Sequence, residues 1–172
     1  MIRIRPAVET DLPAITEIYN EAILTTPATF DVEPKSLEDR RAWFAHHSGR
    51  YGVLVAEEDS RILGWASLSP LGLRAGWRYS VEDSVYVRAS DRGRGVGRAL
   101  LERLLVEARS AGFHTVIARI VADNGASISL HESLGFQPVG TWREVGRKFD
   151  TWLDLLVMQI LFDPGQPPST NA

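Results

Sequence analysis

The chain has 172 residues, of which 44% are hydrophobic and 24% charged, and it contains no cysteine. This composition is that of one globular domain with a substantial core, and it excludes disordered and membrane classes. The missing cysteines exclude disulfides and thiolate chemistry, while a net charge of −3 argues against a nucleic-acid partner. We expect one domain over residues 1–163, a flexible tail over 164–172, no signal or transmembrane segment, and a cytoplasmic location.

The spacing of apolar residues predicts a mixed α/β chain in which strands and helices alternate. Thr10 is expected to cap the first helix, and Ser36 followed by Asp39 has the form of a capping box for the second. A turn between Glu58 and Arg61 predicts a hairpin. In chain order we expect a strand over 2–5, helices beginning near 10 and 36, strands over 53–56, 62–68 and 81–87, a helix ending before 112, a strand over 115–121, a helix over 124–134, and two late strands ending near 162.

A glycine loop studded with arginines leads directly into an amphipathic helix. Glycine can adopt positive φ and lets backbone N–H groups approach a ligand, while the helix start and the guanidinium groups attract anions. The Walker pattern and the dinucleotide fingerprint both require residues that this loop lacks. The loop therefore predicts a phosphate-binding site, with a merely flexible turn as the alternative. The residues concerned are Arg92, Gly93, Arg94, Gly95, Val96, Gly97 and Arg98.

Three further segments accompany the Arg-x-x-Gly-x-Gly motif of this loop. They are Glu-Asp-Ser-Val-Tyr-Val over 82–87, Asn-Gly-Ala-Ser-Ile-Ser-Leu-His over 124–131 with Leu-Gly-Phe over 134–136, and Gly-Arg-Lys-Phe-Asp-Thr-Trp-Leu-Asp over 146–154. This ordered set resembles the GNAT superfamily of N-acetyltransferases, in its phosphinothricin and methionine sulfoximine acetyltransferase branch. The resemblance extends from the first strand to about residue 163. It implies a twisted, mixed, mostly antiparallel sheet of about seven strands flanked by about four helices.

The resemblance also implies acetyl-CoA as co-substrate, with no metal. The glycine loop would hold the pyrophosphate, and the pantetheine arm would lie where the strands over 81–87 and 115–121 splay apart. Backbone groups of Val85, Tyr86 and Val87 would pair with the arm, and Asn124 and Ser133 would contact the cofactor. The implied assembly is a homodimer with residues 148–152 near its interface.

Amine acetylation needs a base, because an amine attacks a thioester only in its unprotonated form. Glu82 is the candidate, since it begins the strand that leads to the glycine loop and partial burial would raise its pKa; the resemblance implies the same role. A solvated strand-end carboxylate is the alternative. His131 is the second candidate for proton transfer, because Asn124, Ser127 and His131 share a helix face; a lone surface histidine is its alternative. Tyr86 is the other possible acid.

Acceptor recognition is expected from the segment before Glu82. Arg74 and Arg78 lie there, and a guanidinium can hold a carboxylate by two hydrogen bonds. Phe30 is a candidate wall of the acceptor pocket, with ordinary packing as the alternative. The resemblance predicts acetyl transfer to the amino group of a small amino-acid-like acceptor such as phosphinothricin or methionine sulfoximine or sulfone. Acetylation of a protein amine, or an acetyl-CoA-binding sensor without catalysis, are the alternatives; neither nucleic acid nor membrane is an expected partner.

Overall fold

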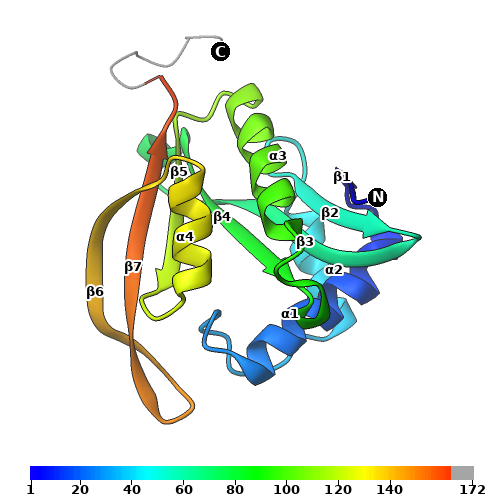
Figure 1. Cartoon of the computed structure of the whole chain (residues 1–172). Helices are drawn as coiled ribbons and strands as arrows, with labels where there is room; N and C mark the ends of the chain where they lie inside the picture. Colours follow the sequence, from blue (N-terminus) through cyan, green and yellow to red (C-terminus); the bar gives the residue numbers. More distant parts are fainter. Residues whose placement is uncertain (164–172) are drawn as a thin grey trace.

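A computed structural model describes residues 1–163, and the predicted tail over 164–172 lies outside the described residues. Within 1–163 the chain forms seven strands and four α-helices in the predicted order, so the expected fold class is confirmed (Figure 1). The elements are β1 (Arg3–Pro6), α1 (Leu12–Thr25), α2 (Leu37–Ala45), β2 (Val53–Glu58), β3 (Arg61–Pro70), β4 (Ser80–Val87), α3 (Val96–Ser110), β5 (Thr115–Val121), α4 (Gly125–Ser133), β6 (Gln137–Lys148) and β7 (Thr151–Leu161), with 3-10 turns at Glu9–Asp11, Ala75–Trp77 and Ala89–Asp91.

The sheet has the strand order β1-β2-β3-β4-β5-β7-β6 and is antiparallel except between β4 and β5. The parallel pair is short: it ends where Glu82 faces Ile117. β5 continues alongside β7 as far as Val121, whereas β4 continues alongside β3 to Val87. The two halves of the sheet therefore diverge beyond Glu82 and Ile117, and we call this point the fork.

Helices cover both faces of the sheet, with α1 and α2 on one side and α3 and α4 on the other (Figure 1). The alternation of side chains along β2 explains the division. Leu54 packs in the cluster of Leu100, whereas its neighbours Val53 and Val55 pack in the cluster of Ile15. Each fully buried leucine or isoleucine contributes about 1.5–3 kcal/mol, so both helical layers are strongly attached.

The first helix begins differently from the prediction. Thr10 does not cap it; residues Glu9–Asp11 form a 3-10 turn, and Asp11 occupies the position before the helix. The Asp11 carboxylate accepts the Val8 N–H at 2.8 Å and pairs with the Arg5 guanidinium at 2.7 Å. A threonine hydroxyl could not form this ion pair with β1, which is why the aspartate takes the position.

Two other local predictions are confirmed. At the start of α2, the Ser36 hydroxyl accepts the Asp39 N–H at 3.1 Å, and the Asp39 carboxylate accepts the Ser36 N–H at 2.9 Å. The β2–β3 hairpin turns at Asp59 and Ser60, whose φ values of 50° and 63° are those of the mirror-image turns that suit hairpins. No helix within residues 1–163 is long and apolar enough to cross a lipid bilayer.

Candidate functional site

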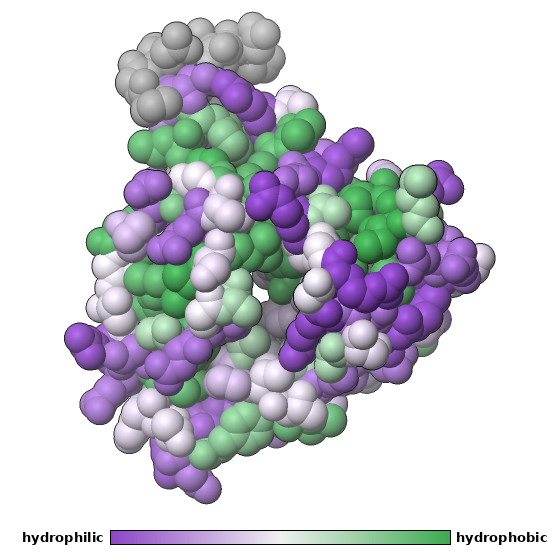
Figure 2. Space-filling model, in the orientation of Figure 1, coloured by the Kyte–Doolittle hydropathy of each residue, from purple (hydrophilic) through white to green (hydrophobic). Residues whose placement is uncertain are grey.

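A cavity of about 500 Å³ lies at the fork. The space-filling view shows the molecule hollowed near its centre, beside α4 (Figure 2). The walls come from β4, from β5, from the inner side of α4, and from the loop that follows α1. Among the predicted site residues, the cavity brings together Phe30, Glu82, Val85, Tyr86, Asn124 and His131.

The glycine loop, residues 92–98, follows the far end of β4. Gly93 and Gly95 have φ values of +75° and +81°, and Gly95 is the residue that caps α3. Among the described residues no side chain caps this helix start, which leaves its first N–H groups available to an anion. The prediction of positive φ at Gly97 is wrong, because this residue lies inside α3. A Cβ there would be 3.4 Å from a Leu130 methyl group, which is an ordinary van der Waals contact, so the protein itself leaves room for a small side chain at this position.

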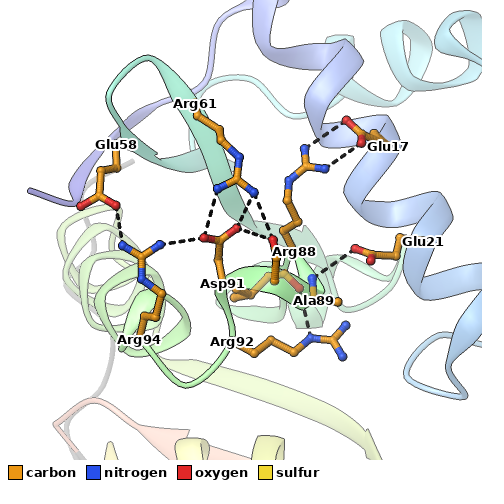
Figure 3. Close-up of polar contacts among 11 residues, drawn as sticks. Glu17, Glu21, Glu58, Arg61, Arg88, Ala89, Asp91, Arg92 and Arg94 are labelled. Atoms are coloured by element: carbon orange, nitrogen blue, oxygen red, sulfur yellow. Dashed lines mark hydrogen bonds and ion pairs between the residues drawn. The ribbon is translucent and has the colours of Figure 1, made fainter.

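Asp91 fixes the shape of the glycine loop (Figure 3). This carboxylate is 2% exposed and accepts hydrogen bonds from the Arg61 guanidinium at 2.8 Å, the Arg94 guanidinium at 2.7 Å and the Ser90 hydroxyl at 2.9 Å. Burial alone would raise the pKa of Asp91, but these hydrogen bonds outweigh it and lower the pKa. Arg94 also pairs with Glu58, so the structure holds this predicted phosphate ligand between two carboxylates.

The other two arginines of the loop are differently placed. Arg92 is exposed and donates to the Val87 carbonyl at 3.3 Å. Arg98 donates to the Ser133 hydroxyl at 3.0 Å and pairs with Glu102 at 2.8 Å. Arg98 and Ser133, both predicted to contact the cofactor, therefore lie side by side, on α3 and α4.

Glu82 is paired with an arginine that the sequence analysis missed. The Arg119 guanidinium on β5 donates to both carboxylate oxygens of Glu82, with Nε 2.6 Å from Oε1. These hydrogen bonds raise the pKa of Arg119. The available signal was one charged residue inside the otherwise apolar strand over 115–121. The ionised carboxylate is the form of Glu82 that can accept a proton, and the ion pair fixes its direction at the cavity wall.

His131 is buried, not a surface histidine, with 3% of its surface exposed. Its Nε2 lies 2.9 Å from Oδ2 of Asp83, and its Nδ1 lies 2.7 Å from the carbonyl of Ser127. Burial alone would lower the pKa of His131, but the Asp83 carboxylate and the Ser127 carbonyl raise it above the ordinary value. Two acceptors face the two ring nitrogens, and the protonated imidazole satisfies both. The sequence analysis assigned no role to Asp83.

The side chain of Tyr86 lies on the face of β4 opposite to that of Asp83. Its ring stacks on Trp65 with centroids 4.9 Å apart and meets the edge of Tyr19 at 5.0 Å. Burial raises the pKa of Tyr86, so its phenol keeps its proton at neutral pH. The side chains of Val85 and Val87 pack with the α3 core, which leaves their backbone as the contact available to a ligand. Within residues 1–163, β4 has no partner strand on its β5 side beyond the fork.

Asn124 and Phe30 both line the cavity. The Asn124 side chain accepts the Ser127 N–H at 3.2 Å and so caps α4. The Phe30 ring, 37% exposed, lies against Gly146 of β6. Arg74 and Arg78 are exposed, contact the rings of their neighbours Trp77 and Tyr79, and are not among the residues that line the cavity.

The family is now decided by comparison with known proteins. Residues 15–136 match the acetyltransferase (GNAT) family. The chain belongs to this family. It is 45% identical over 166 residues to the L-methionine sulfoximine/L-methionine sulfone acetyltransferase of Salmonella typhimurium, which covers 96% of this chain and 97% of the relative. It is 41% identical to the phosphinothricin N-acetyltransferase of Streptomyces coelicolor, over 90% of this chain and 92% of the relative.

Solved structures agree with this assignment. An acetyltransferase from Salmonella typhimurium with its cofactor acetyl-CoA matches at a TM-score of 0.95 and 43% identity, over 98% of both chains. The phosphinothricin acetyltransferase from Sinorhizobium meliloti, in complex with acetyl-CoA, matches at 0.95 and 34%, over 99% of this chain and 95% of that one. The predicted resemblance is confirmed, and this GNAT protein is an N-acetyltransferase. Its residues 1–163 contain no group of three His, Asp or Glu side chains that could hold a metal ion.

Proposed function

We propose that this acetyltransferase transfers the acetyl group of acetyl-CoA to the amino group of a small amino-acid-like acceptor by direct attack in a ternary complex. Methionine sulfoximine, methionine sulfone and phosphinothricin are the acceptors we propose, and the names of the relatives support them. The observation that carries the proposal is the cavity at the fork, with Glu82 on its wall. A carboxylate there can meet an amine that enters beside Phe30.

The residues at the far end of β4 fit acetyl-CoA. The glycine loop offers the uncapped start of α3 to a pyrophosphate, and added Cβ atoms at Gly93 and Gly95 would meet no protein atom within 4 Å, so the loop surface is open to a ligand. The unpaired edge of β4 from Asp83 to Val87 offers backbone groups to an arm that carries amides. When bound, acetyl-CoA supplies the thioester carbonyl that the amine attacks.

Glu82 is the base in this proposal. Held by Arg119, it accepts a proton from the acceptor ammonium, directly or through one water, and so keeps the amine nucleophilic. We propose that Tyr86, and not His131, is the side chain that returns a proton to sulfur. Tyr86 holds its proton at neutral pH because burial raises its pKa. His131 would have to release a proton that it shares with Asp83 or with the Ser127 carbonyl.

On the acceptor side, we propose that Phe30 packs against the acceptor and that Arg74 and Arg78 meet its carboxylate. The Phe30 ring supports this role because it is partly exposed and lies on the cavity wall. The two guanidinium groups are at the surface, so an acceptor would have to extend from the cavity to reach them.

We further propose that the protein is cytoplasmic, because acetyl-CoA is an intracellular metabolite. We also propose that it is a homodimer. The β6–β7 hairpin exposes Trp142, Phe149 and Trp152 by 51%, 57% and 58%. Exposed aromatic groups of this size are characteristic of protein–protein contacts. Sedimentation velocity measures the mass in solution, and a single-chain mass at micromolar concentration would contradict the dimer.

Glu82→Gln tests the catalytic proposal. With methionine sulfoximine as acceptor and release of the CoA thiol as readout, turnover at neutral pH should fall about 10²-fold, the usual contribution of a general base. Calorimetry should find acetyl-CoA affinity unchanged, and raising the pH should restore part of the turnover by deprotonating the amine. The matched control is Glu132→Gln on the exposed side of α4. Turnover equal to the wild type from pH 7 to 9 would assign Glu82 a structural role.

A further inference from the structure

Asp83 occupies a special place in the sheet. It is the residue of β4 directly after the fork, where pairing with β5 has just ended. Its side chain points away from that of Glu82 because neighbouring residues of a strand face opposite sides. There it meets α4, which lies over the diverging strands (Figure 1), and its Oδ2 is 2.9 Å from Nε2 of His131.

Both members of this pair are buried, Asp83 with 7% and His131 with 3% of its surface exposed. Nδ1 of His131 is 2.7 Å from the Ser127 carbonyl, and the edge of the ring packs against Phe136. With acceptors at both nitrogens, the imidazole is held in one orientation. Both ring nitrogens face acceptors of the protein itself, Asp83 and the Ser127 carbonyl, so this geometry does not suit direct proton donation.

α4 forms one wall of the cavity through Asn124, Ser127 and His131, and β4 forms another through Ser84 and Val85. The distance between these walls sets the space for the cofactor arm. The Asp83–His131 hydrogen bond joins the two elements at the closed end of that space.

We propose that Asp83 and His131 are positioning residues that form a charged latch between β4 and α4, and that this latch holds the groove at the width that acetyl-CoA requires. The inference rests on the proposed function, because it concerns the binding of acetyl-CoA. It assigns the pair to cofactor affinity and not to the chemical step. Removing one partner leaves the other buried without its counter-charge, which is strongly unfavourable.

The latch has a defined pH dependence. The groups facing His131 are Asp83 on β4, the Ser127 carbonyl on α4 and the Phe136 ring; the other charged groups at the cavity are the Glu82–Arg119 pair and Asp31, which accepts from Tyr19. The folded-state pKa of His131 is raised. The stabilisation from the protonated His131 is therefore fully present at a pH below the ordinary histidine pKa. It is lost as the pH rises through the raised pKa of His131 and the imidazole loses its proton.

The test compares Asp83→Asn and His131→Gln with the wild type and with His46→Gln, an exposed histidine on the other side of the sheet. Calorimetry from pH 6 to 9 measures the Kd of acetyl-CoA, and turnover is measured at saturating acetyl-CoA and methionine sulfoximine. In both latch variants we expect Kd at pH 7 to rise about tenfold, as for loss of a hydrogen bond to a charged group, with kcat within about twofold. The Kd of the wild type should increase as the pH approaches 9, whereas the Kd of the two latch variants should not change with pH.

Three results would overturn the latch. A fall in kcat with Kd unchanged would make His131 the proton donor, and variants with neither Kd nor its pH dependence altered would make the pair ordinary packing. Should the variants not fold, NMR of the wild-type imidazole decides: His131 must titrate above its ordinary pKa of about 6.5, and a lower value contradicts the proposal. Failure of the wild type itself to bind acetyl-CoA would instead refute the proposed function.

Discussion

The two loops that flank β4 differ in how firmly the rest of the protein holds them. Residues 88–98, after the strand, are tied to the protein body: Arg88 pairs with Glu17 on α1, and the buried Asp91 gathers hydrogen bonds from three side chains (Figure 3). Residues 71–79, before the strand, have mainly local contacts. Leu73 is fully exposed, and Trp77 is 46% exposed.

This difference fits the roles that we propose for the two loops, with the cofactor at residues 92–98 and the acceptor at residues 71–79. A cofactor has the same shape in every turnover, so a loop fixed in advance loses little conformational entropy on binding it. Acceptors differ among relatives, which include phosphinothricin and methionine sulfoximine enzymes. A loop with local contacts can change its side chains without disturbing the core. On this proposal, the end of β4 that binds the cofactor is held firmly, and the end that binds the acceptor is open to variation.

The largest expected effect is at Gly95. Its φ of +81° is unfavourable for other residues by about 1–2 kcal/mol, and a glutamate also places negative charge where the pyrophosphate would bind. Gly95→Glu should lower acetyl-CoA affinity by more than about 10²-fold in calorimetry, and Gly95→Ala should show the backbone strain alone. Gly76→Glu in the acceptor loop, where an added Cβ meets nothing within 4 Å, is the control. Unchanged binding by Gly95→Glu would refute the cofactor assignment of this loop.

A smaller effect is expected at Arg94. Because Arg94 is held by Asp91 and Glu58, Arg94→Ala should lower the melting temperature, but only slightly, since its side chain is 44% exposed and exposed ion pairs contribute little to stability. Its effect on acetyl-CoA Kd should be independent of salt. Arg92→Ala should weaken binding and reduce the salt dependence of Kd, as loss of a phosphate contact does. Thermal unfolding, together with calorimetry of acetyl-CoA binding at two ionic strengths, distinguishes the two variants. A reduced salt dependence of Kd in Arg94→Ala would show that Arg94 is a phosphate ligand.

The smallest effect is expected at the acceptor loop. Arg78 is exposed and stacks on Tyr79, so Arg78→Ala should raise the acceptor KM several-fold, less than the tenfold of a desolvated pair. The acetyl-CoA KM and the melting temperature should not change. The control compares the KM of methionine sulfoximine with the KM of its carboxamide, which lacks the carboxylate. Arg78→Ala should reduce the difference between these two KM values. If the difference stays the same, another residue recognises the carboxylate.

The sequence predicted the elements well because their signals are local. The capping box at Ser36 depends on residues within one helical turn, and the strand over 115–121 on its own apolar run. The pairs Glu82–Arg119 and Asp83–His131 could not be predicted, because each joins two elements whose register is set by tertiary packing.

The glycine loop shows the same limit within one motif. Gly95 and Gly97 look equivalent in the sequence, yet the first has positive φ and the second lies inside a helix against Leu130. Whether a glycine of this motif needs its conformational freedom depends on where α3 begins. The family motif identified the loop, but the physical reason for each glycine required the structure.

The contact between Phe30 and Gly146 has a consequence for evolution. A Cβ on Gly146 would come within 2.6 Å of the phenyl ring, so a larger residue on β6 must displace the ring from its place on the cavity wall. Position 146 is not among the residues that line the cavity, yet it determines where residue 30 can sit. If Phe30 contacts the acceptor as we propose, a larger residue at position 146 would change the shape of the acceptor space without touching the acceptor, and a smaller side chain at position 30 would compensate for it. Substrate range would then change through paired substitutions at positions far apart in the chain.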